Sequence, residues 1–261
     1  MFDKVIRSAE TKFRRAIWSP TTWLKGQVRS RNVTKYGVTD YGGWRLVEDM
    51  MRKNGKVLLC GAGEDISFDL AIQKQFSCEI IIVDPTPRAI AHYEKILNTQ
   101  KAGVRLGING SSSVFYEYSG VDFAKINFVP LAVWHEETKL KFWRPYFDDH
   151  VSHSVTNYQG ADSGYIEVDS DTLDHIAQRF GFSIGDVDLV KLDIEGAEYS
   201  VIEWMCKSQF LPRQILVEFD EMNFPNKLTE EKIKTVVSQL QQCGYELGHF
   251  DGSSNCVFVK G

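Results

Sequence analysis

The pattern of hydrophobic and polar positions changes its period near residue 194. Residues 187–194 are mostly apolar or β-branched, which predicts a strand buried on both faces of a sheet. The apolar residues at positions 197, 201, 204 and 205 then follow helical spacing and predict a helix that packs back on that sheet. Asp193 and Glu195 lie at the junction. Open α/β sheets bind their ligands at the carboxyl ends of strands, so we expect function around Asp193.

Strand and helix patterns alternate along the rest of the chain. Residues 57–70 predict a strand, a glycine turn and a helix, and residues 79–84 predict a buried strand that ends in an acid. Further elements are expected as strands at 128–134, 138–143 and 215–219, helices at 45–53, 91–97, 172–182 and 233–240, and a hairpin at 245–260. This order predicts an α/β fold, a doubly wound and mostly parallel seven-stranded sheet with a terminal antiparallel hairpin.

The first 40 residues differ from the rest of the chain. Residues 1–35 contain nine Lys or Arg and only two acids, and residues 1–18 follow the spacing of an amphipathic helix. Such a helix can bind an anionic membrane surface or an acidic partner, or it can pack on the protein body or on a second subunit, which we favour. We expect a basic amphipathic extension at 1–40 and one domain at 41–261, with insertions at about 103–125 and 144–164.

The composition predicts where in the cell the protein acts and which classes of partner it binds. The chain has no run of 18 apolar residues and no apolar centre typical of a signal peptide near its start, which predicts a cytoplasmic protein, with peripheral membrane contact left to residues 1–18. The acidic body argues against nucleic-acid binding. The five cysteines are widely spaced and lie mostly in apolar runs. They are interpreted as reduced core residues, and no metal site is expected from them.

The glycine turn of residues 61–66 is the first candidate for ligand binding. Gly61 and Gly63 allow a sharp turn and a close approach of a ligand to the backbone. Ile66 stands where a dinucleotide-binding fingerprint has its third glycine, which argues against a pyrophosphate. Glu64 and Asp65 also argue against one, because two carboxylates at the start of a helix would repel phosphates and favour a positively charged ligand.

Asp84 ends the strand that follows the glycine turn in the sequence. An acid at this position can accept hydrogen bonds from both hydroxyl groups of a ribose. Alternatively, Asp84 is a turn or helix-cap residue before Pro85. Because the glycine turn precedes it, we favour a pocket for a nucleoside without phosphates.

Two motifs together resemble a known family. Thr172-Leu173-Asp174 is followed at short spacing by residues 188–198, DLVKLDIEGAE, and the chain ends in a VEF strand and a hairpin. This arrangement resembles the S-adenosylmethionine-dependent methyltransferases of the FkbM type, over roughly residues 41–260. The resemblance implies a Rossmann-like class I methyltransferase fold and S-adenosylmethionine as the methyl donor. It also implies transfer to hydroxyl oxygens, often of sugars.

The resemblance assigns roles to residues of this chain. Gly61 and Gly63 would approach the methionine part of the donor, and Asp84 would bind its ribose. Asp193 would border both the donor and the acceptor, together with Glu195.

Methylation of an oxygen requires a base that removes its proton. Asp193 is our first candidate, although it could instead cap a helix that starts near Glu195. Glu195 is a second candidate, or it merely complements the helix dipole. Glu218 and His153 are further candidates, and His153 lies in residues 144–164, which form either an acceptor-binding lid or a surface excursion.

A divalent cation held by Asp193, Glu218 and Asp220 would be compatible with the sequence, but the spacing of these residues does not require it.

The sequence therefore predicts O-methylation of a small-molecule or glycan acceptor, most readily a saccharide hydroxyl. Several aromatic residues could stack on sugar rings, although most are expected in the core: Trp44, Tyr116, Tyr118, Trp134, Trp143 and Tyr146. Two alternatives remain, an NAD-dependent oxidoreductase and a non-catalytic binding module on the same fold.

Overall fold

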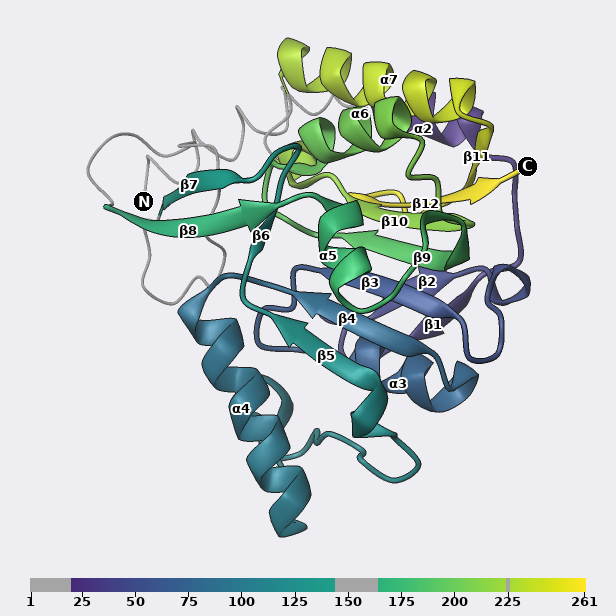
Figure 1. Cartoon of the computed structure of the whole chain (residues 1–261). Coiled ribbons are helices and arrows are strands. Elements are labelled where there is room, and N and C mark those ends of the chain that lie inside the picture. Colours follow the sequence, from purple (N-terminus) through teal and green to yellow (C-terminus); the bar gives the residue numbers. More distant parts are fainter. Residues whose placement is uncertain (1–19, 144–163, 224–225) are drawn as a thin grey trace, which may run out of the picture.

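The structure is a computed structural model that describes residues 20–143, 164–223 and 226–261. Its centre is a seven-stranded sheet of order β11-β12-β10-β9-β3-β4-β5 (Figure 1). The strands are β3 (Lys56–Cys60), β4 (Glu79–Val83), β5 (Ile126–Val129), β9 (Val187–Leu192), β10 (Gln214–Glu218), β11 (Tyr245–Phe250) and β12 (Asn255–Lys260). β12 runs antiparallel to both of its neighbours, β11 and β10, and all other neighbouring pairs of this sheet are parallel. The predicted fold class and the terminal hairpin are thereby confirmed.

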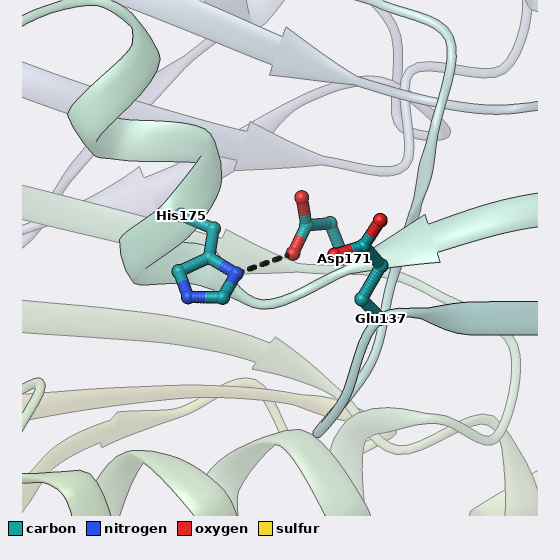
Figure 2. A group of neighbouring side chains, drawn as sticks. All are labelled: Glu137, Asp171 and His175. Carbon is teal, nitrogen blue, oxygen red and sulfur yellow. Dashed lines mark hydrogen bonds and ion pairs between the residues drawn. The ribbon is translucent and has the colours of Figure 1, made fainter.

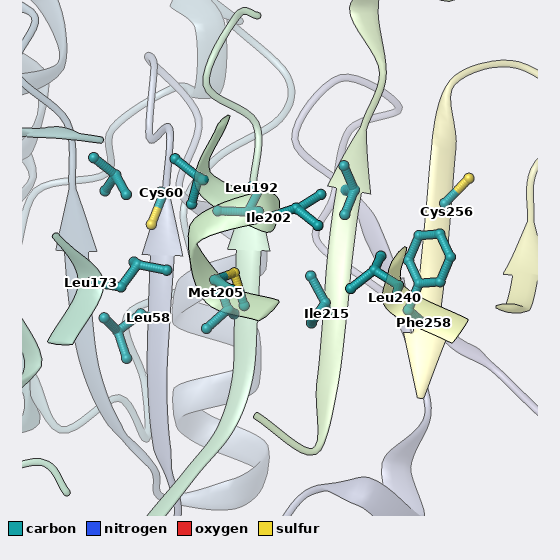
Figure 3. Close-up of a cluster of buried hydrophobic side chains, with 14 of the residues drawn as sticks. Leu58, Cys60, Leu173, Leu192, Ile202, Met205, Ile215, Leu240, Cys256 and Phe258 are labelled. Atoms are coloured by element: carbon teal, nitrogen blue, oxygen red, sulfur yellow. The ribbon is translucent and has the colours of Figure 1, made fainter. Parts of the chain in front are cut away.

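The strands are apolar on both faces because helices cover both sides of the sheet. On one face, Leu58 and Cys60 of β3 join a core that Figure 3 shows in close-up. On the other face, Val57 and Leu59 of the same strand join a second core. Successive residues of a strand point to opposite faces, so a continuous apolar run serves both cores.

The helices divide between these two cores. The first core contains side chains of α5 (Leu173–Arg179), α6 (Glu198–Ser208), α7 (Lys227–Gln242) and α2 (Thr21–Gln27). The second contains those of α3 (Ser67–Phe76) and α4 (Pro87–Ala102). Figure 1 shows α6 and α7 along one side of the molecule and α4 on the other. This is the doubly wound arrangement that the sequence predicted.

The predicted helix at 45–53 is wrong. The chain instead forms the short antiparallel strands β1 (Thr34–Tyr36) and β2 (Trp44–Leu46), and then a 3-10 turn at Glu48–Met50. Two buried side chains hold this path. The side-chain amide of Gln214 both accepts from and donates to the backbone of Val47, at 3.0 and 3.1 Å. Asp188 accepts hydrogen bonds from the backbone N–H and the Nε of Arg52, at 2.8 and 2.6 Å. These contacts across the sequence override the helical pattern.

The predicted strand at 128–134 is two strands in different sheets. β5 ends at Val129, and Pro130 lies between it and β6 (Ala132–Val133). β6 belongs to a three-stranded sheet with β8 (Tyr165–Asp171) and β7 (Thr138–Trp143), of order β6-β8-β7. The strand predicted at 138–143 is confirmed as β7 and is antiparallel to β8, but the prediction that it is inserted near an edge of the main sheet is wrong, because it lies in this small sheet. The sequence did not predict β8. This small sheet lies beside the carboxyl end of the main sheet (Figure 1).

The predicted insertion at 103–125 contributes to the core. Leu106, Ile108 and Tyr116 are buried in the second core, and the segment continues directly into β5. The predicted division at residues 40 and 41 stays a prediction, and these residues lie in the loop between β1 and β2. The basic helix predicted at residues 1–18 lies outside the described residues.

None of the helices in the described part of the chain is both long and apolar enough to span a bilayer. All five cysteines are unpaired, and Cys60, Cys78 and Cys256 are buried, as the sequence predicted.

Candidate active site

A pocket lies at the carboxyl ends of β3, β4 and β9. It has an empty volume of about 820 Å³, part of which is open to solvent. Its walls come from the glycine turn after β3, the segment after β4, the segment 191–197 and the small sheet. The lining includes Tyr41, Gly42, Trp44, Gly61, Gly63, Asp65, Asp69, Asp84, Lys191, Asp193 and Glu195. Of the predicted site residues, Gly61, Gly63, Asp65, Asp84, Asp193 and Glu195 line this pocket, whereas Glu64 and Glu218 do not, and His153 lies outside the described residues.

The glycine turn is shaped by the strand end beside it. Gly61 has φ +85°, and a Cβ atom on it would lie 1.8 Å from the carbonyl oxygen of Asp193. Both the backbone conformation and this close approach therefore require glycine. Gly63 has φ +52°, and a Cβ atom on it would lie 3.2 Å from the Tyr41 hydroxyl. The need for Gly61 arises from the protein itself and not only from a ligand.

Asp84 binds the glycine turn directly. One carboxylate oxygen accepts from the backbone N–H groups of Ala62 and Gly63, at 2.9 and 3.0 Å. The other accepts from the N–H and the hydroxyl of Thr86, at 2.8 and 2.6 Å. A carboxylate has about four acceptor positions, so these bonds use nearly all of its capacity. Asp84 holds both the glycine turn and the start of α4, where Thr86 is the N-cap.

The two acids of the glycine turn have different surroundings. Asp65 is buried and accepts from the Thr39 hydroxyl at 2.6 Å and from the N–H of Ser67 at 2.9 Å. Glu64 forms an ion pair with Arg88 at 2.5 Å, and both side chains are partly exposed. Glu64 lines a neighbouring groove and not the pocket itself. The backbone N–H of Ile66 donates to the hydroxyl of Tyr116, so this N–H group also has a partner within the protein.

Lys191 is the main site residue that sequence reasoning missed. It is buried in β9, and its ammonium donates to the carbonyl of Gly61 at 2.6 Å and to Asp193 at 2.9 Å. It also lies 4.8 Å from the centre of the Trp44 ring, in a cation–π contact. A lysine within a strand buried on both faces was the available signal, because such a charge needs an internal partner.

Charges inside the pocket shift the pKa values of its groups. Burial lowers the pKa of Lys191, but the carboxylates of Asp193 and Asp69 outweigh this and raise it overall. Burial raises the pKa of Asp69 to about 7, although the charge of Lys191 opposes that shift. At neutral pH the site therefore holds one ammonium group among several carboxylates, one of which is partly protonated.

The segment between β9 and α6 differs from its prediction. We expected Asp193 to cap a helix starting near Glu195, but α6 starts at Glu198 and Asp193 does not cap it. Glu198 instead accepts from the N–H groups of Ile194 and Gly196, at 2.8 and 2.9 Å. Glu195 has φ +52° and lines the pocket, in a conformation that non-glycine residues seldom adopt. Asp193 is thus available to the pocket and is not used as a helix cap.

More acids gather at the ends of β9 and β10. Burial, and then the charge of Asp193, raise the pKa of Glu218 to about 7. Burial, and then the charges of Glu195 and Glu218, raise the pKa of Asp220 to about 11, and one of its oxygens is buried without a hydrogen-bond partner among the described residues. Both pKa values are raised because burial and neighbouring carboxylates disfavour the charged form of each group.

Within the described ranges, three potential metal-ligand atoms lie within 4.8 Å of one another in one place only, at Glu137, Asp171 and His175 (Figure 2). Asp193, Glu218 and Asp220 do not form such a set. Asp171 is buried, and it accepts from the N–H of Thr172 at 2.8 Å and from His175 at 2.9 Å. It also forms an ion pair with Arg179. Because the guanidinium already supplies a positive charge, we interpret this group as a support for α5.

A second hollow runs between α6 and α7, next to Gly196. It has an empty volume of about 1050 Å³ and a mixed lining of aromatic, hydroxyl, amide and charged side chains. The residues are Trp134, Gly196, Tyr199, Ser200, Glu203, Leu228, Glu231, Lys232, Thr235, Val236 and Gln239. We call it the α6–α7 groove. The groove and the pocket adjoin the same segment, since Glu195 and Ala197 line the pocket and Gly196 lines the groove.

The aromatic residues considered for sugar stacking are spread over several parts of the fold. Trp44 and Tyr116 are buried in the second core, and Tyr118 packs against it. Trp134 lines the α6–α7 groove. Tyr146 and the catalytic candidate His153 lie outside the described residues.

Comparison with known proteins identifies a sequence family. The family model described as the methyltransferase FkbM domain matches residues 60–247. No curated protein matches the chain.

Solved structures with a similar arrangement include the fibrillarin of Aeropyrum pernix with natively bound S-adenosyl-L-methionine. The two share 11% identity, 80% of this chain and 67% of that chain are covered, and the TM-score is 0.39. The fibrillarin pre-rRNA processing protein of Methanococcus jannaschii shares 10% identity, over 93% and 76% of the two chains, with a TM-score of 0.39. A methyltransferase from Pyrococcus furiosus shares 11% identity, over 82% and 79%, with a TM-score of 0.37. The functional assignment rests on the family match and the site residues.

Proposed function

The chain belongs to the FkbM methyltransferase family, and from this premise we propose that it methylates a hydroxyl oxygen of a saccharide or glycan acceptor. It is an S-adenosylmethionine-dependent methyltransferase, and the family assignment leaves the NAD-dependent alternative without support. The observation that carries the proposal is the α6–α7 groove beside Gly196, where aromatic rings and neutral hydrogen-bonding groups lie together next to the pocket.

The charges of the pocket fit the donor. When bound, S-adenosylmethionine supplies a methyl group on a positively charged sulfonium, and its methionine part carries an ammonium group. Asp65, Asp69, Asp84, Asp193 and Glu195 line the pocket. Within the described part of the chain, Lys191 is the only cationic residue of the lining, and it is engaged with Gly61 and Asp193. Such a lining favours a cation and repels a diphosphate. We propose that the glycine turn and these acids hold the donor.

We propose that Asp193 orients the acceptor and takes its proton. Asp193 lines the pocket, and the exposed fraction of its side chain is 28%. Lys191 fixes one of its carboxylate oxygens, which sets the direction of the other. Glu195 and Glu218 lie nearby, and the raised pKa of Glu218 would let it pass a proton onward near neutral pH. His153 stays a candidate that the described residues do not test.

The α6–α7 groove has the chemistry of a saccharide site. Saccharides present apolar ring faces that stack on aromatic side chains and hydroxyls that pair with polar ones. Tyr199 is fixed by a hydrogen bond of 2.9 Å from its hydroxyl to Glu221, and Trp134 is half-buried. Ser200, Thr235 and Gln239 offer neutral donors and acceptors along the same groove. We propose that sugar units next to the methylated one bind there.

Two experiments test the proposal in order. Calorimetric titration with S-adenosylmethionine, S-adenosylhomocysteine and NAD should give micromolar binding of the first two and none of the third. Transfer of labelled methyl groups to a panel of neutral oligosaccharides should then yield a methyl ether, located on its hydroxyl by NMR. Donor binding with transfer only to amine or carbon acceptors would overturn O-methylation.

A matched pair of variants links the groove to the acceptor. Tyr199→Ala should raise the KM for an oligosaccharide about tenfold while leaving the donor affinity unchanged, because stacking contributes about 1 kcal/mol or more. Tyr165→Ala removes an exposed aromatic ring on β8 and serves as the control. If both variants changed the KM for the oligosaccharide equally, the proposal that the groove binds the acceptor would lose its support.

The role of residues 1–18 also stays a proposal. A contact with a membrane surface or with a second subunit predicts that deleting them lowers co-sedimentation with anionic liposomes or changes the molecular mass in solution. If neither changes, the extension has neither role.

A further inference from the structure

The loop 37–43 lies outside the region that the family model matches, yet it forms part of the pocket wall. Tyr41 and Gly42 of this loop line the pocket together with Gly63 and Asp65 of the glycine turn. The loop connects β1 to β2, and β2 is anchored because Trp44 and Leu46 are buried in the second core. A segment that the family match does not cover therefore completes the donor end of the site.

The loop is attached to the glycine turn through Asp65. The Thr39 hydroxyl donates to Asp65 at 2.6 Å and accepts from the N–H of Gly42 at 2.8 Å. Gly42 lies so close that a Cβ atom on it would stand 2.3 Å from the carboxyl carbon of Asp65. The N–H of Val38 donates to the Ser67 hydroxyl at 3.0 Å. These contacts place both ends of the loop on the segment that begins α3.

Tyr41 is positioned at the centre of the loop, over the glycine turn. The residue is 60% exposed, whereas its hydroxyl lies 3.2 Å from the position of a Cβ atom on Gly63. Burial of the hydroxyl, and then the charges of Asp193 and Glu195, raise the pKa of Tyr41 above its ordinary value. The hydroxyl therefore stays protonated and can act as a hydrogen-bond donor. Tyr41 also lines the neighbouring groove of Glu64 and Arg88, so that its side chain separates the two spaces.

The loop has the features of a segment that can open. Gly37 has φ +91°, and Gly42 and Gly43 stand at the other end of the loop, so glycines flank residues 38–41. Val38 and Tyr41 are large apolar or aromatic side chains left exposed at 59% and 60%. Among the described residues, hydrogen bonds to Asp65 and Ser67 hold the loop down, besides an exposed ion pair of Lys35 with Asp40. Such an exposed ion pair adds little.

We propose that loop 37–43 is a cover of the methyl-donor site, with Asp65 as its latch and Tyr41 as the residue that closes over the donor. The inference rests on the donor-binding part of the proposed function. Asp65 then serves both in the acidic lining and as the anchor of the loop, Tyr41 faces the donor, and Thr39 is a positioning residue. A donor enters or leaves when Asp65 releases Thr39. The closed loop excludes water from the methyl group, which methyl transfer requires.

Thr39→Val tests the latch in the full-length protein because it removes only the bridging hydroxyl. Amide hydrogen exchange of the ligand-free protein should show that Gly42 loses protection, since its N–H loses its acceptor. The dissociation rate constant of S-adenosylhomocysteine should rise about tenfold, the effect expected for a hydrogen bond to a carboxylate. Thr99→Val is the control, because the Thr99 hydroxyl donates to the backbone carbonyl of Lys95 within α4 and Thr99 lines neither the pocket nor the α6–α7 groove.

Tyr41→Ala separates closure from latching. The latch contacts remain in this variant, so Gly42 should stay protected while S-adenosylhomocysteine dissociates faster. Unchanged exchange and unchanged dissociation in Thr39→Val, or unchanged dissociation in Tyr41→Ala, would overturn the proposal. If the wild-type protein binds neither S-adenosylmethionine nor S-adenosylhomocysteine, the donor assignment fails. Hydrogen exchange at Gly42 would still show whether Thr39 holds the loop, because it needs no bound donor.

Discussion

Asp84 and Asp193 follow two strands, β4 and β9, that lie on either side of β3, and the protein holds the two carboxylates in opposite ways. Asp84 is buried and accepts four hydrogen bonds from Ala62, Gly63 and Thr86. Asp193 is partly exposed and has a charged partner, Lys191, at 2.9 Å. From the sequence alone, both are simply acids at strand ends.

The difference separates a structural acid from one that can act on a ligand. A carboxylate whose acceptor positions are filled by backbone and hydroxyl donors fixes the surrounding chain, and a ligand must compete with those donors. A carboxylate with one ion pair and a partly exposed side chain keeps acceptor positions for an incoming group. We therefore expect loss of Asp84 to affect folding and donor binding together, and loss of Asp193 to affect mainly turnover.

The largest effect is expected from Asp84→Ala. It leaves the N–H groups of Ala62, Gly63 and Thr86 without their acceptor, and each such loss costs about 1–3 kcal/mol. The free energy of unfolding should fall by roughly 3–5 kcal/mol, and the affinity for S-adenosylmethionine by about a hundredfold or more. Urea titration and calorimetry measure the two quantities. A variant of normal stability that has lost donor binding would instead make Asp84 a direct ribose ligand.

Asp193→Asn should lower kcat by about a hundredfold or more, as expected for removal of a general base. The amide keeps an oxygen that can accept from Lys191, so the donor affinity should change by less than about tenfold. Steady-state kinetics and calorimetry provide the comparison. Asp186→Asn, near the other end of β9, is the control, because Asp186 is partly exposed and its ion pair with Lys56 is long, at 3.6 Å. If Asp193→Asn kept the kcat of the wild type, Asp193 would not be the general base, and Glu195 or Glu218 would be the next candidate.

Asp69→Asn should have an intermediate effect that depends on pH. Burial raises the pKa of Asp69 from 3.8 to about 7, so the folded state binds more protons than the unfolded state between these values. The contribution of Asp69 to stability is therefore complete below pH 3.8 and is lost as the pH rises through about 7. The variant should be more stable than the wild type by about 1–3 kcal/mol at pH 8 and similar to it near pH 4.

Urea titrations at these two pH values test the sign of this effect. Asp49→Asn is the control, because Asp49 is exposed. A stability difference for Asp69→Asn that is the same at both pH values would show that ionisation of Asp69 does not determine it.

The smallest effect is expected from Glu64→Gln. Glu64 pairs with Arg88 at the surface, and exposed ion pairs contribute about 0–1 kcal/mol. The donor affinity and the free energy of unfolding should both stay within about 0.5 kcal/mol of the wild type. A larger loss of donor affinity would mean that Glu64 contacts the donor, as the sequence predicted.

The sequence predicted most of the main sheet because its strands are buried on both faces. In a chain with alternating helices, continuous apolar runs such as 79–83 and 187–192 are typical of strands that lie between two helical layers. The failures occurred where distant residues decide the local structure. The helix expected at 45–53 does not form because Gln214 and Asp188 bind the backbone there. No local pattern reveals such partners.

The candidate site was predicted in part for the same reason. Gly61, Gly63, Asp65, Asp84, Asp193 and Glu195 line one pocket, as strand ends in a parallel sheet would suggest. The role of each of these residues depends on its hydrogen-bond partners, which are far away in the sequence. Thr39 binds Asp65, and Lys191 binds the carbonyl of Gly61. The cover formed by residues 37–43 was therefore not predicted.

The contact between Gly61 and Asp193 has a consequence for engineering the enzyme. The N–H of Asp193 donates to Cys60 at 3.1 Å, Lys191 donates to Gly61, and no side chain fits between Gly61 and the Asp193 carbonyl. The glycine turn after β3 and the end of β9 at Asp193 therefore form one packed unit. A chimera that exchanges only one of them would not pack correctly there. Exchanging α6, α7 and the lining of their groove should transfer the acceptor preference, provided that the glycine turn and the end of β9 come from the same parent.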